Sequence, residues 1–378
     1  MINFINKDDY QASLFSNRLS KKYKTLRKWA RRSRITCYRL YDRDIPEVPL
    51  AADLYEFLPD SISGKNETAR FMAGEYAGLS ANDKKIETET ASRQYLTLYL
   101  YERPYEKPET EENIWLSKMA DAAAVTVRIP REHIIIKTRK RDKGGSQYAK
   151  NTEEPSVQSS LTGVVQEQGQ IFRINLTDYL DSGLFFDHRI LRSRIRETCS
   201  GKTVLNLYCY TAGFSVYAAE GHAKKIDSVD LSNTYLNWAE DNMALNDFTD
   251  KGKYDFIRAD VKEFIAQKKA VKERYDIIIL DPPTFSNSKM ADSMLDINRD
   301  WTNLVNNCIA LLAPTGVLYF STNSHRLAFS TELIAKKTDD GCSIHTEDIS
   351  DATIPEDYTG TKIHRCWKIE AGKIRETF

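Results

Sequence analysis

The sequence of 378 residues lacks long hydrophobic runs, and its unbroken aliphatic segments are short, such as 277–280 (IIIL). A membrane-spanning helix needs about 20 apolar residues in succession, so we expect no membrane segment. An apolar stretch of the kind found in secretory signals is also missing, because the charged residues 7–9 (KDD) lie at the N-terminus. These absences favour a cytoplasmic protein.

Closely spaced cysteines are missing as well. The six cysteines lie far apart and include no C-x-x-C pair, which argues against a zinc ribbon and against a disulfide framework. We therefore expect reduced thiols and no metal site. The cysteines are Cys37, Cys199, Cys209, Cys308, Cys342 and Cys366.

The chain has no net charge, but its charge is unevenly distributed. Residues 1–47 hold 12 Lys and Arg against 5 Asp and Glu, and the segment 18–34 holds nine basic residues and no acidic one. Clustered Lys and Arg make phosphate contacts that depend steeply on salt. This end of the chain is therefore the expected RNA-binding part, with a charged, solvated helix as the alternative.

Residues 10–33 contain few helix breakers, and Leu14, Leu19, Leu26 and Trp29 form part of an apolar stripe. The pattern predicts a basic amphipathic helix whose basic face is available to a partner. The candidate RNA contacts are Arg18, Lys21, Lys22, Lys24, Arg27, Lys28, Arg31 and Arg32, together with Lys137, Arg139, Arg141 and Lys143 from a later segment.

The rest of the N-terminal half predicts a small α+β domain. Strands are expected at 34–41, 49–57, 94–101, 133–138, 160–167 and 170–176, and a helix at 113–127. Residues 58–90 show no steady period and are expected to be an insertion or a mobile loop, and 140–156 an exposed loop.

From Lys202 onward, strands and helices alternate. Strands are expected at 203–208, 225–229, 254–258, 275–280 and 316–322, helices from residues 212, 232, 261, near 292 and from 330, and two more strands at 343–349 and 363–369. Such units form a parallel sheet covered by helices on both faces. We expect an α/β protein of two domains, with the N-terminal helix and α+β domain over 1–180 and a Rossmann-like domain over 181–378.

In an open parallel sheet, ligands bind beyond the carboxyl ends of the strands. The first of these strands leads into a small-residue turn that lets the backbone approach a ligand. Its candidate cofactor contacts are Asn206, Tyr208, Tyr210, Thr211 and Gly213. The alternative is an ordinary turn between strand and helix, with the glycine present for packing.

Single carboxylates follow the second and third strands. Asp230, followed by Leu231, stands where a carboxylate accepts hydrogen bonds from both hydroxyls of a ribose. Its alternative role is at the N-terminus of the next helix. Asp260, followed by Val261, is placed to meet the exocyclic amine of an adenine, or else is a helix N-cap.

The fourth strand is followed by Asp281-Pro282-Pro283-Thr284-Phe285. Two prolines fix an extended backbone, so the strand cannot continue into a helix and the carboxylate is held at the rim of the sheet. Such a motif recurs in nucleic-acid methyltransferases, where the aromatic ring stacks on the target base, a contact worth roughly 1–3 kcal/mol. We expect Asp281, Pro282, Pro283 and Phe285 to be the catalytic residues, with Asp281 also near the cofactor.

A pyrophosphate-binding G-x-G-x-x-G motif is absent, because the turn has the single glycine Gly213. This argues against a dinucleotide cofactor. S-adenosylmethionine carries no phosphate, so a turn that wraps an amino-acid tail and a nucleoside is sufficient. The predicted cofactor is therefore S-adenosylmethionine.

Several of these motifs resemble the RlmK-type 23S rRNA guanine-N7 methyltransferases, which form the C-terminal half of the bacterial RlmKL fusion. The likeness rests on residues 181–189 (DSGLFFDHR), 205–213, 229–240 and 281–289 (DPPTFSNSK), and in the N-terminal half on 37–42 (CYRLYD) and 137–139. It covers most of the chain. The other half of that fusion, a guanine-N2 methyltransferase, has no counterpart in this sequence, and residues 58–90 are longer than the family leads us to expect.

The resemblance implies a class I methyltransferase that acts on 23S rRNA or on a large-subunit assembly intermediate. It implies that Asp230 binds the ribose of S-adenosylmethionine, that Asp260 lies near its adenine, and that Asp281 lies near its methionine end and the target base. Asp187 and Arg189 are expected to border the cofactor pocket.

Other acceptors and one other class of function stay open at this point. An exocyclic amine of guanine or adenine could use the same motif, with its N–H groups donating to Asp281. Methylation of cytosine C5 needs a cysteine nucleophile, and the fifth strand is followed by Ser321-Thr322-Asn323-Ser324 instead. An RNA-binding ribosome-assembly protein without catalysis is the non-enzyme alternative.

Overall fold

The computed structural model describes residues 6–62, 64–77, 91–102, 105, 107–138, 160–286 and 294–372. They divide into two compact units. The first holds the described residues up to Ser182 together with 356–361, and the second holds those of 183–355 and from Lys362 onward. Among the described residues, no helix is long and apolar enough to cross a membrane.

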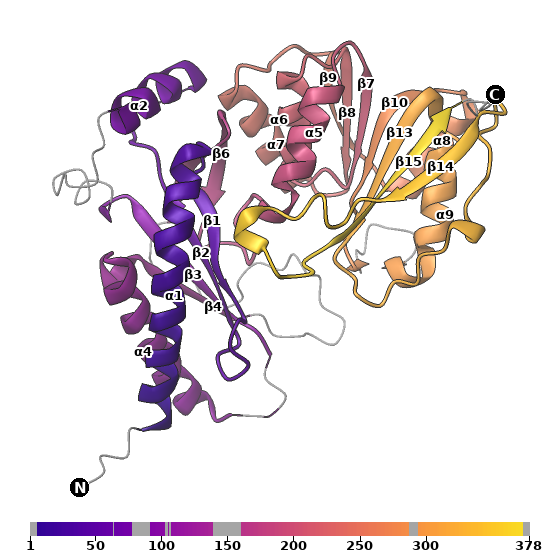
Figure 1. The fold of residues 1–378 in the computed structure, drawn as a ribbon. Coiled ribbons are helices and arrows are strands. Elements are labelled where there is room, and N and C mark those ends of the chain that lie inside the picture. Colours follow the sequence, from indigo (N-terminus) through magenta and orange to yellow (C-terminus); the bar gives the residue numbers. More distant parts are fainter. Residues whose placement is uncertain are drawn as a thin grey trace, which may run out of the picture. The chain divides into compact units, whose positions relative to one another are not determined.

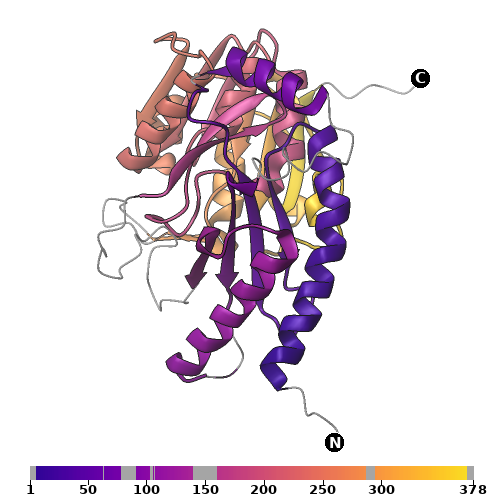
Figure 2. The same ribbon diagram turned by 90° about the vertical axis from the view of Figure 1, so that its left-hand side faces the viewer.

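The first unit is built on a four-stranded sheet with the order β1-β2-β3-β4. Its strands are β1 (Cys37–Asp42), β2 (Leu50–Glu56), β3 (Gln94–Leu100) and β4 (Ile134–Thr138), of which only β3 and β4 pair in parallel. Helices α1 (Lys7–Arg32) and α4 (Glu109–Val127) pack against each other beside this sheet, as Figures 1 and 2 show. Their buried faces and the strands share one hydrophobic core.

Helix α1 confirms the predicted amphipathic pattern. Its buried residues are Gln11, Ala12, Phe15, Leu19, Leu26 and Ala30, which recur at helical spacing and form one stripe. Asn6 caps the first turn by accepting a hydrogen bond from the Asp8 backbone N–H. Acidic residues in the first turn and basic residues in the last turn complement the helix dipole.

The first unit also contains elements that the sequence predicted less well. The region 58–90, expected to be irregular, includes helix α2 (Lys65–Ala77), so that prediction is wrong for these residues. Its remainder 78–90 and the predicted loop 140–156 lie outside the described residues. Strands β5 (Thr162–Glu167) and β6 (Gln170–Asn175) form the expected hairpin.

A short segment from late in the chain belongs to the first unit, which no local sequence pattern indicated. Its turn η4 (Glu356–Tyr358) lies against β1, where the Asp357 carboxylate accepts a hydrogen bond from the Arg39 backbone N–H at 3.0 Å. The buried Arg39 guanidinium lies over the Tyr358 ring and is held by Asp53 at 2.7 and 2.9 Å. Charge-assisted pairing of this kind compensates for the burial of the guanidinium.

The second unit confirms the predicted Rossmann-like architecture. Its seven-stranded sheet has the order β14-β15-β13-β10-β7-β8-β9. The strands are β7 (Thr203–Leu207), β8 (Lys225–Asp230), β9 (Tyr254–Arg258), β10 (Tyr275–Leu280), β13 (Leu312–Thr322), β14 (Ser343–Asp348) and β15 (Arg365–Gly372), the last two pairing antiparallel. The helices are α5 (Arg189–Thr198), α6 (Gly213–Glu220), α7 (Asn233–Leu245), α8 (Val261–Ala270) and α9 (Ile297–Ile309).

Two helix predictions in this unit need correction. The helix expected from Ser330 is only the single turn η3 (Thr331–Leu333), which Ser330 caps. Since β13 and β14 each pair antiparallel with β15, they run parallel to each other, and the crossover between them is made by this turn and by irregular chain instead of a helix. The Asn306 side chain instead holds the segment by bonding to the Leu333 carbonyl and the Ala335 N–H. Helix α5 was not predicted.

Candidate active site

The order of the sheet places a switch point between β7 and β10. From β7 the chain proceeds to β8 and β9 on one side, and β10 and β13 lie on the other side. Ligands of such sheets bind at the carboxyl ends of the strands that flank this point. The turn after β7 and the carboxylates Asp230, Asp260 and Asp281 all follow these strand ends. The four positions singled out in the sequence thus share one edge of the sheet.

The turn after β7 has an unusual backbone. Tyr208, Tyr210 and Ala212 have φ angles of 58°, 51° and 62°, in the left-handed region that residues other than glycine seldom adopt. Such strain persists where the surroundings hold it, and it gathers at functional sites. Here the Thr211 hydroxyl donates to the Gly183 carbonyl at 2.5 Å, and the Asn242 amide donates to the Thr211 carbonyl at 2.9 Å.

Asp230 connects this turn to β8. One carboxylate oxygen accepts a hydrogen bond from the Tyr210 N–H at 3.0 Å, and the other accepts one from the Ser232 N–H at 2.9 Å. Burial raises the pKa of Asp230, against the opposite effect of these N–H donors. The N-cap of α7 is Ser232, and Asp230 bonds to the N–H of that residue, so the alternative of a carboxylate at the helix N-terminus also fits its position.

Asp260 does serve as a helix cap. Its carboxylate accepts hydrogen bonds from the backbone N–H groups of Lys262 and Glu263 at the start of α8. Asp260 is therefore the N-cap of α8, as the alternative expected. Its carboxylate also lies at the same edge of the sheet as Asp230. Val261 is buried in the core below it.

The other candidates of the cofactor turn differ in exposure. The Asn206 side chain is buried and donates to the Ser215 hydroxyl at 2.9 Å, so it ties β7 to α6. Burial raises the pKa of Tyr208, which stays a neutral phenol. Gly213 begins α6 with little space beside it, since an added Cβ would meet the Leu184 side chain at 3.4 Å. Leu231 accepts a hydrogen bond from Arg258 through its carbonyl.

Aromatic rings surround the turn. The Tyr210 ring lies 5.1 Å from Phe185, 4.7 Å from Tyr235 and 6.4 Å from Trp238, measured between centroids. Gly183 has a φ of +109°, and an added Cβ would lie 2.2 Å from the Trp238 ring. Only glycine fits there. This aromatic cluster was not predicted from the sequence.

The motif after β10 presents a carboxylate and an aromatic ring. Asp281 has a side chain that is 25% exposed, Pro282 is buried, and Phe285 is 53% exposed on β11 (Phe285–Ser286). Strand β11 pairs with β12 (Leu295–Asp296), which fixes the ring at the surface. An exposed ring held in this way provides a stacking surface. Residues 287–293, between β11 and β12 in the sequence, lie outside the described residues.

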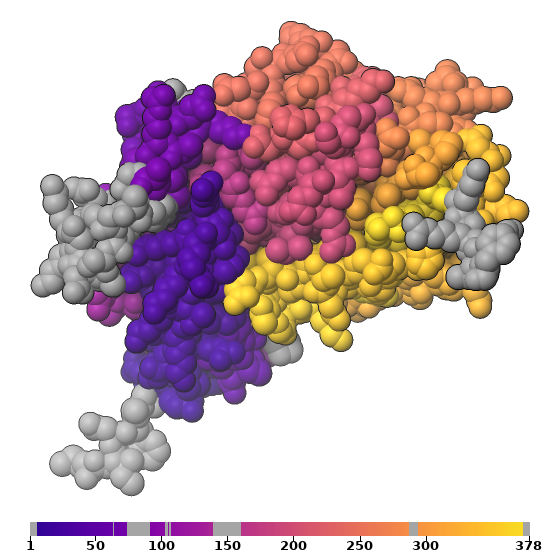
Figure 3. Space-filling model, turned by 45° about the horizontal axis from the view of Figure 1, so that its top comes forward, coloured from indigo at the N-terminus to yellow at the C-terminus, as the bar shows by residue number. Residues whose placement is uncertain are grey.

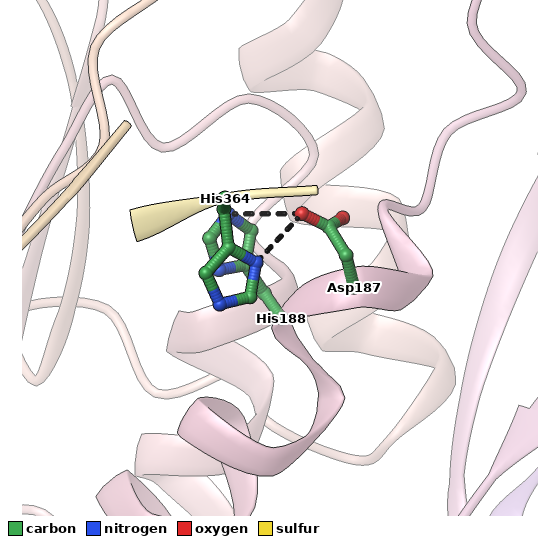
Figure 4. A group of neighbouring side chains, drawn as sticks. All are labelled: Asp187, His188 and His364. Carbon is green, nitrogen blue, oxygen red and sulfur yellow. Dashed lines mark hydrogen bonds and ion pairs between the residues drawn. The ribbon is translucent and has the colours of Figure 1, made fainter. Parts of the chain in front are cut away.

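Two histidines lie directly beneath Asp281, and sequence reasoning missed both. Asp187 and His188 come from the turn η2 (Phe186–His188), and His364 immediately precedes β15. His188 Nε2 lies 3.1 Å from the Asp281 carboxylate, and His364 Nδ1 lies 3.0 Å from that of Asp187. Figure 4 shows the Asp187 carboxylate directed at both rings. Asp187, His188 and His364 are a group with metal-ligand atoms within 4.8 Å of one another.

The flanking arginines are structural. Arg189 is fully buried beside the Phe186 ring, and Arg192 is buried with its guanidinium donating to the Phe185 carbonyl at 2.7 Å. Arg189 therefore contacts η2 through the Phe186 ring. The Asp187 side chain is also largely buried, and its carboxylate contacts His364 at 3.0 Å and His188 at 3.8 Å.

The cysteines are free thiols. Cys209 and Cys308 are buried, and burial raises the pKa of both thiols. Cys366 is also buried, and burial and the nearby Asp281 charge raise its pKa. No local pattern indicated that Cys366 lies near Asp281, because β15 reaches that edge only through its antiparallel pairing with β13.

In the first unit, the basic residues of α1 mostly face outward. Lys21, Lys24, Lys28 and Arg32 are exposed, and the outer side of α1, in indigo, is visible in Figure 3. Arg27 and Arg31 are partly exposed. Arg18 and Lys22 form ion pairs with Asp44 at 2.6 and 2.9 Å.

The basic candidates after α1 are not seen as exposed RNA contacts. Lys137 is buried, and its ammonium group donates to the Tyr179 and Leu180 carbonyls at 2.6 and 3.1 Å. The prediction that Lys137 contacts RNA is therefore corrected, because its charge is used inside the unit. Arg139, Arg141 and Lys143 lie outside the described residues.

A sheet of this order, with a carboxylate after β8 and a turn lacking the pyrophosphate glycines, defines the class of Rossmann-like S-adenosylmethionine-dependent methyltransferases. The family model described as S-adenosylmethionine-dependent methyltransferase matches residues 86–355. The crystal structure of SMU.776 complexed with SAH has the same fold, with a TM-score of 0.64 and 19% identity over 95% of this chain and 82% of that chain.

Sequence relatives identify the family within this class. Ribosomal RNA large subunit methyltransferase K of Neisseria meningitidis serogroup B is 38% identical over 355 residues, which cover 94% of this chain and 86% of that protein. The K/L protein of Pseudomonas syringae pv. tomato is 40% identical over 362 residues, 95% of this chain but 41% of that protein. The chain belongs to the ribosomal RNA large subunit methyltransferase K family, and it spans less than half the length of the K/L relatives.

Proposed function

We propose that this protein methylates N7 of a guanine in 23S rRNA of the large ribosomal subunit, with S-adenosylmethionine as the methyl donor. The observation that carries the proposal is Asp281 at the switch point of a family K methyltransferase, with the exposed ring of Phe285 four residues further on. Phe285 would stack on the target base, while Asp281 and the backbone of Pro282 and Pro283 orient it.

Guanine N7 suits a site of this composition. Its lone pair lies in the plane of the ring and carries no proton, so it attacks the methyl sulfonium without a general base. The protein then has to bring the nitrogen within about 3–3.5 Å of the methyl carbon, in line with the departing sulfur. Asp281 already forms an ion pair with His188 at 3.1 Å. The geometry leaves this carboxylate the role of an orienting acceptor, and N7, unlike an exocyclic amine, has no proton to lose.

For the cofactor, we propose that Asp230 binds the ribose hydroxyls, that the residues near Asp260 receive the adenine, and that the turn 208–213 follows the methionine end. When bound, S-adenosylmethionine supplies the electrophilic methyl group. The backbone hydrogen bonds of Asp230 to Tyr210 and Ser232 fix its carboxylate before the cofactor arrives. A carboxylate fixed in advance loses little side-chain entropy on binding.

For the RNA, we propose that the first unit is the RNA-binding domain and the second unit the catalytic domain. The exposed cations of α1 would contact phosphates, which provide affinity and register without reading bases. We further propose that the enzyme acts in the cytoplasm, where large-subunit rRNA is assembled, and its free thiols are compatible with that location.

The other acceptors are weaker candidates. Cytosine C5 methylation needs a thiolate, and burial keeps Cys209, Cys308 and Cys366 as thiols. A non-catalytic assembly protein would not need the strained backbone of the turn 208–213 or an Asp281 carboxylate paired with His188.

Incubation of the purified protein with labelled S-adenosylmethionine and rRNA from a strain lacking this gene tests the proposal. Mass spectrometry of the digested RNA should identify 7-methylguanosine, at one position. N2-methylguanosine, N6-methyladenosine or 5-methylcytidine would identify another acceptor. No methylation of either naked rRNA or isolated large-subunit precursors would contradict the proposal.

A further inference from the structure

The side chains below Asp281 form a continuous chain of polar contacts. The His364 ring bonds to Thr353 through Nε2 and to Asp187 through Nδ1, each at 3.0 Å. The Asp187 carboxylate is 3.8 Å from His188 Nε2, which is 3.1 Å from Asp281. Apart from Asp281, every member is buried, so the chain of contacts runs from the interior of the second unit to the edge of the sheet.

The geometry of the two rings does not suit a metal ion. The His188 and His364 rings are stacked, with centroids 4.7 Å apart and planes 15° from parallel. The lone pair of an imidazole nitrogen lies in the plane of its ring, and zinc is bound about 2.0–2.1 Å from that nitrogen. An ion shared by two stacked rings would lie outside both planes. Hydrogen bonds that each ring donates to its own carboxylate, His188 to Asp281 and His364 to Asp187, fit the arrangement better.

The surroundings of His188 determine its charge. The groups that face it are Asp281 at the end of β10, Asp187 on its own turn, His364 before β15 and Arg192 on α5. Burial and the Arg192 charge lower the pKa of His188, but the two carboxylates outweigh them and raise it to about 9. His188 is therefore an imidazolium at neutral pH, and the pKa of Asp187 lies well below its usual range.

One nitrogen of this ring is unsatisfied. His188 Nδ1 is buried and has no hydrogen-bond partner among the described residues. The unmet group would be a donor in the imidazolium and an acceptor in the neutral ring, so it does not favour either charge state. The position of the His188 ring between two carboxylates favours the imidazolium, because both carboxylates attract its proton.

We propose that His188 is the positioning residue of Asp281. Its imidazolium holds the Oδ2 atom of that carboxylate from the buried side, which leaves Oδ1 to accept hydrogen bonds from the N–H groups of the target guanine. His364 and Asp187 in turn fix the His188 ring. The identity of the base that Asp281 contacts rests on the proposed function. The pairing of His188 with Asp281 does not depend on that function.

The exposure of His188 and Asp281 supports these separate roles for the two oxygens of the Asp281 carboxylate. The His188 side chain is 7% exposed and that of Asp281 is 25% exposed, so the carboxylate has one inner and one outer side. Without the imidazolium, Asp281 could rotate and would share a buried region with the second carboxylate, Asp187. Like charges so placed repel, and a rotated acceptor orients the base poorly.

Two variants test the assignment. His188→Gln keeps a side-chain N–H donor but no charge, and His188→Ala removes both. In single-turnover methylation at saturating RNA and cofactor, we expect the rate to fall by about tenfold in His188→Gln and on the order of 100-fold in His188→Ala. The affinity for S-adenosylmethionine should stay within about twofold. The control is His345→Gln, an exposed histidine on β14, which should behave as the unmodified protein.

A measurement without turnover separates this proposal from the proposed function. In protein labelled with ¹⁵N-histidine, the His188 ring should titrate near pH 9, and Asp281→Asn should move its titration to a lower pH. That result would uphold the pairing even if the methylated base proved to be another. The proposal is overturned if the titration ignores Asp281→Asn, if both His188 variants transfer methyl groups normally, or if Zn²⁺ binds tightly and stoichiometrically and is lost in His364→Ala.

Discussion

The charge on His188 makes the stability of the second unit depend on pH in a predictable direction. The pKa of this ring is raised from 6.5 to about 9 in the folded protein. The imidazolium therefore contributes its full stabilisation below pH 6.5, and this contribution is lost as the pH rises through 9. The difference in pKa corresponds to about 3 kcal/mol at most, since one pKa unit is worth roughly 1.4 kcal/mol.

The comparison of the unmodified protein with His188→Gln isolates this contribution. Lysines, tyrosines and cysteines that titrate at alkaline pH are common to both proteins, so their effects cancel. The difference in unfolding free energy should fall by about 3 kcal/mol between pH 6 and pH 10, in favour of the variant. Urea unfolding, followed by pulsed hydrogen exchange of peptides from β10 and β15, reads the second unit separately from the first.

The refuting result is a difference that stays constant over this range. It would mean that His188 is neutral in the folded protein or that its charge is equally stabilised in the unfolded chain. A decline that appears below pH 6 instead would assign the effect to the carboxylates. His345→Gln serves as the control, because this side chain is exposed.

Three further outcomes follow from the same site. Asp230→Ala should weaken S-adenosylmethionine binding by at least tenfold in calorimetry, since it removes the proposed ribose acceptor, and unchanged affinity would exclude it from the site. Cys308→Ser should leave turnover within about twofold, whereas a covalent adduct with 5-fluorocytosine RNA would restore cytosine chemistry. Reversal of four exposed cations of α1 to Glu should weaken RNA binding and lower its salt slope by roughly one unit per lost phosphate contact, with cofactor binding unchanged. The cations are Lys21, Lys24, Lys28 and Arg32, and reversal of the exposed Lys251, Lys269 and Lys272 of the second unit is the control.

Elements with a strong local period could be predicted from the sequence. Strand β9 begins and ends at the predicted residues, and in α1 the expected stripe residues Leu19 and Leu26 are buried, while Leu14 and Trp29 are partly buried. The reason is that alternation with a period of 2 or 3.6 reports which face is buried, whatever lies opposite. The carboxylates at the strand ends were found for a related reason, since the topology of a parallel sheet brings the ends of its strands together.

The features that were missed depend on contacts between distant parts of the chain. His364 meets Asp187 across 177 positions, and nothing near either residue marks the pairing. Lys137 carried a weak signal, because it lies within a predicted strand next to three isoleucines, where a free lysine is unusual. Its charge is satisfied by carbonyls about 40 residues later, a contact that no local pattern reports.

The charge balance of the site explains why positioning matters more than electrostatics in the proposed reaction. Asp187, His188 and Asp281 together carry one net negative charge when the ring is protonated. Before transfer the positive charge lies on the sulfonium, and afterwards it lies on the methylated guanine, within the same site. The fixed charges of the site then stabilise both states similarly, and such uniform stabilisation does not accelerate the step. The rate must therefore depend on how accurately the base is held, which is the role assigned to Asp281, Phe285 and the imidazolium behind them. The affinity for the RNA backbone must come from cations, and we propose that the exposed face of α1 provides them.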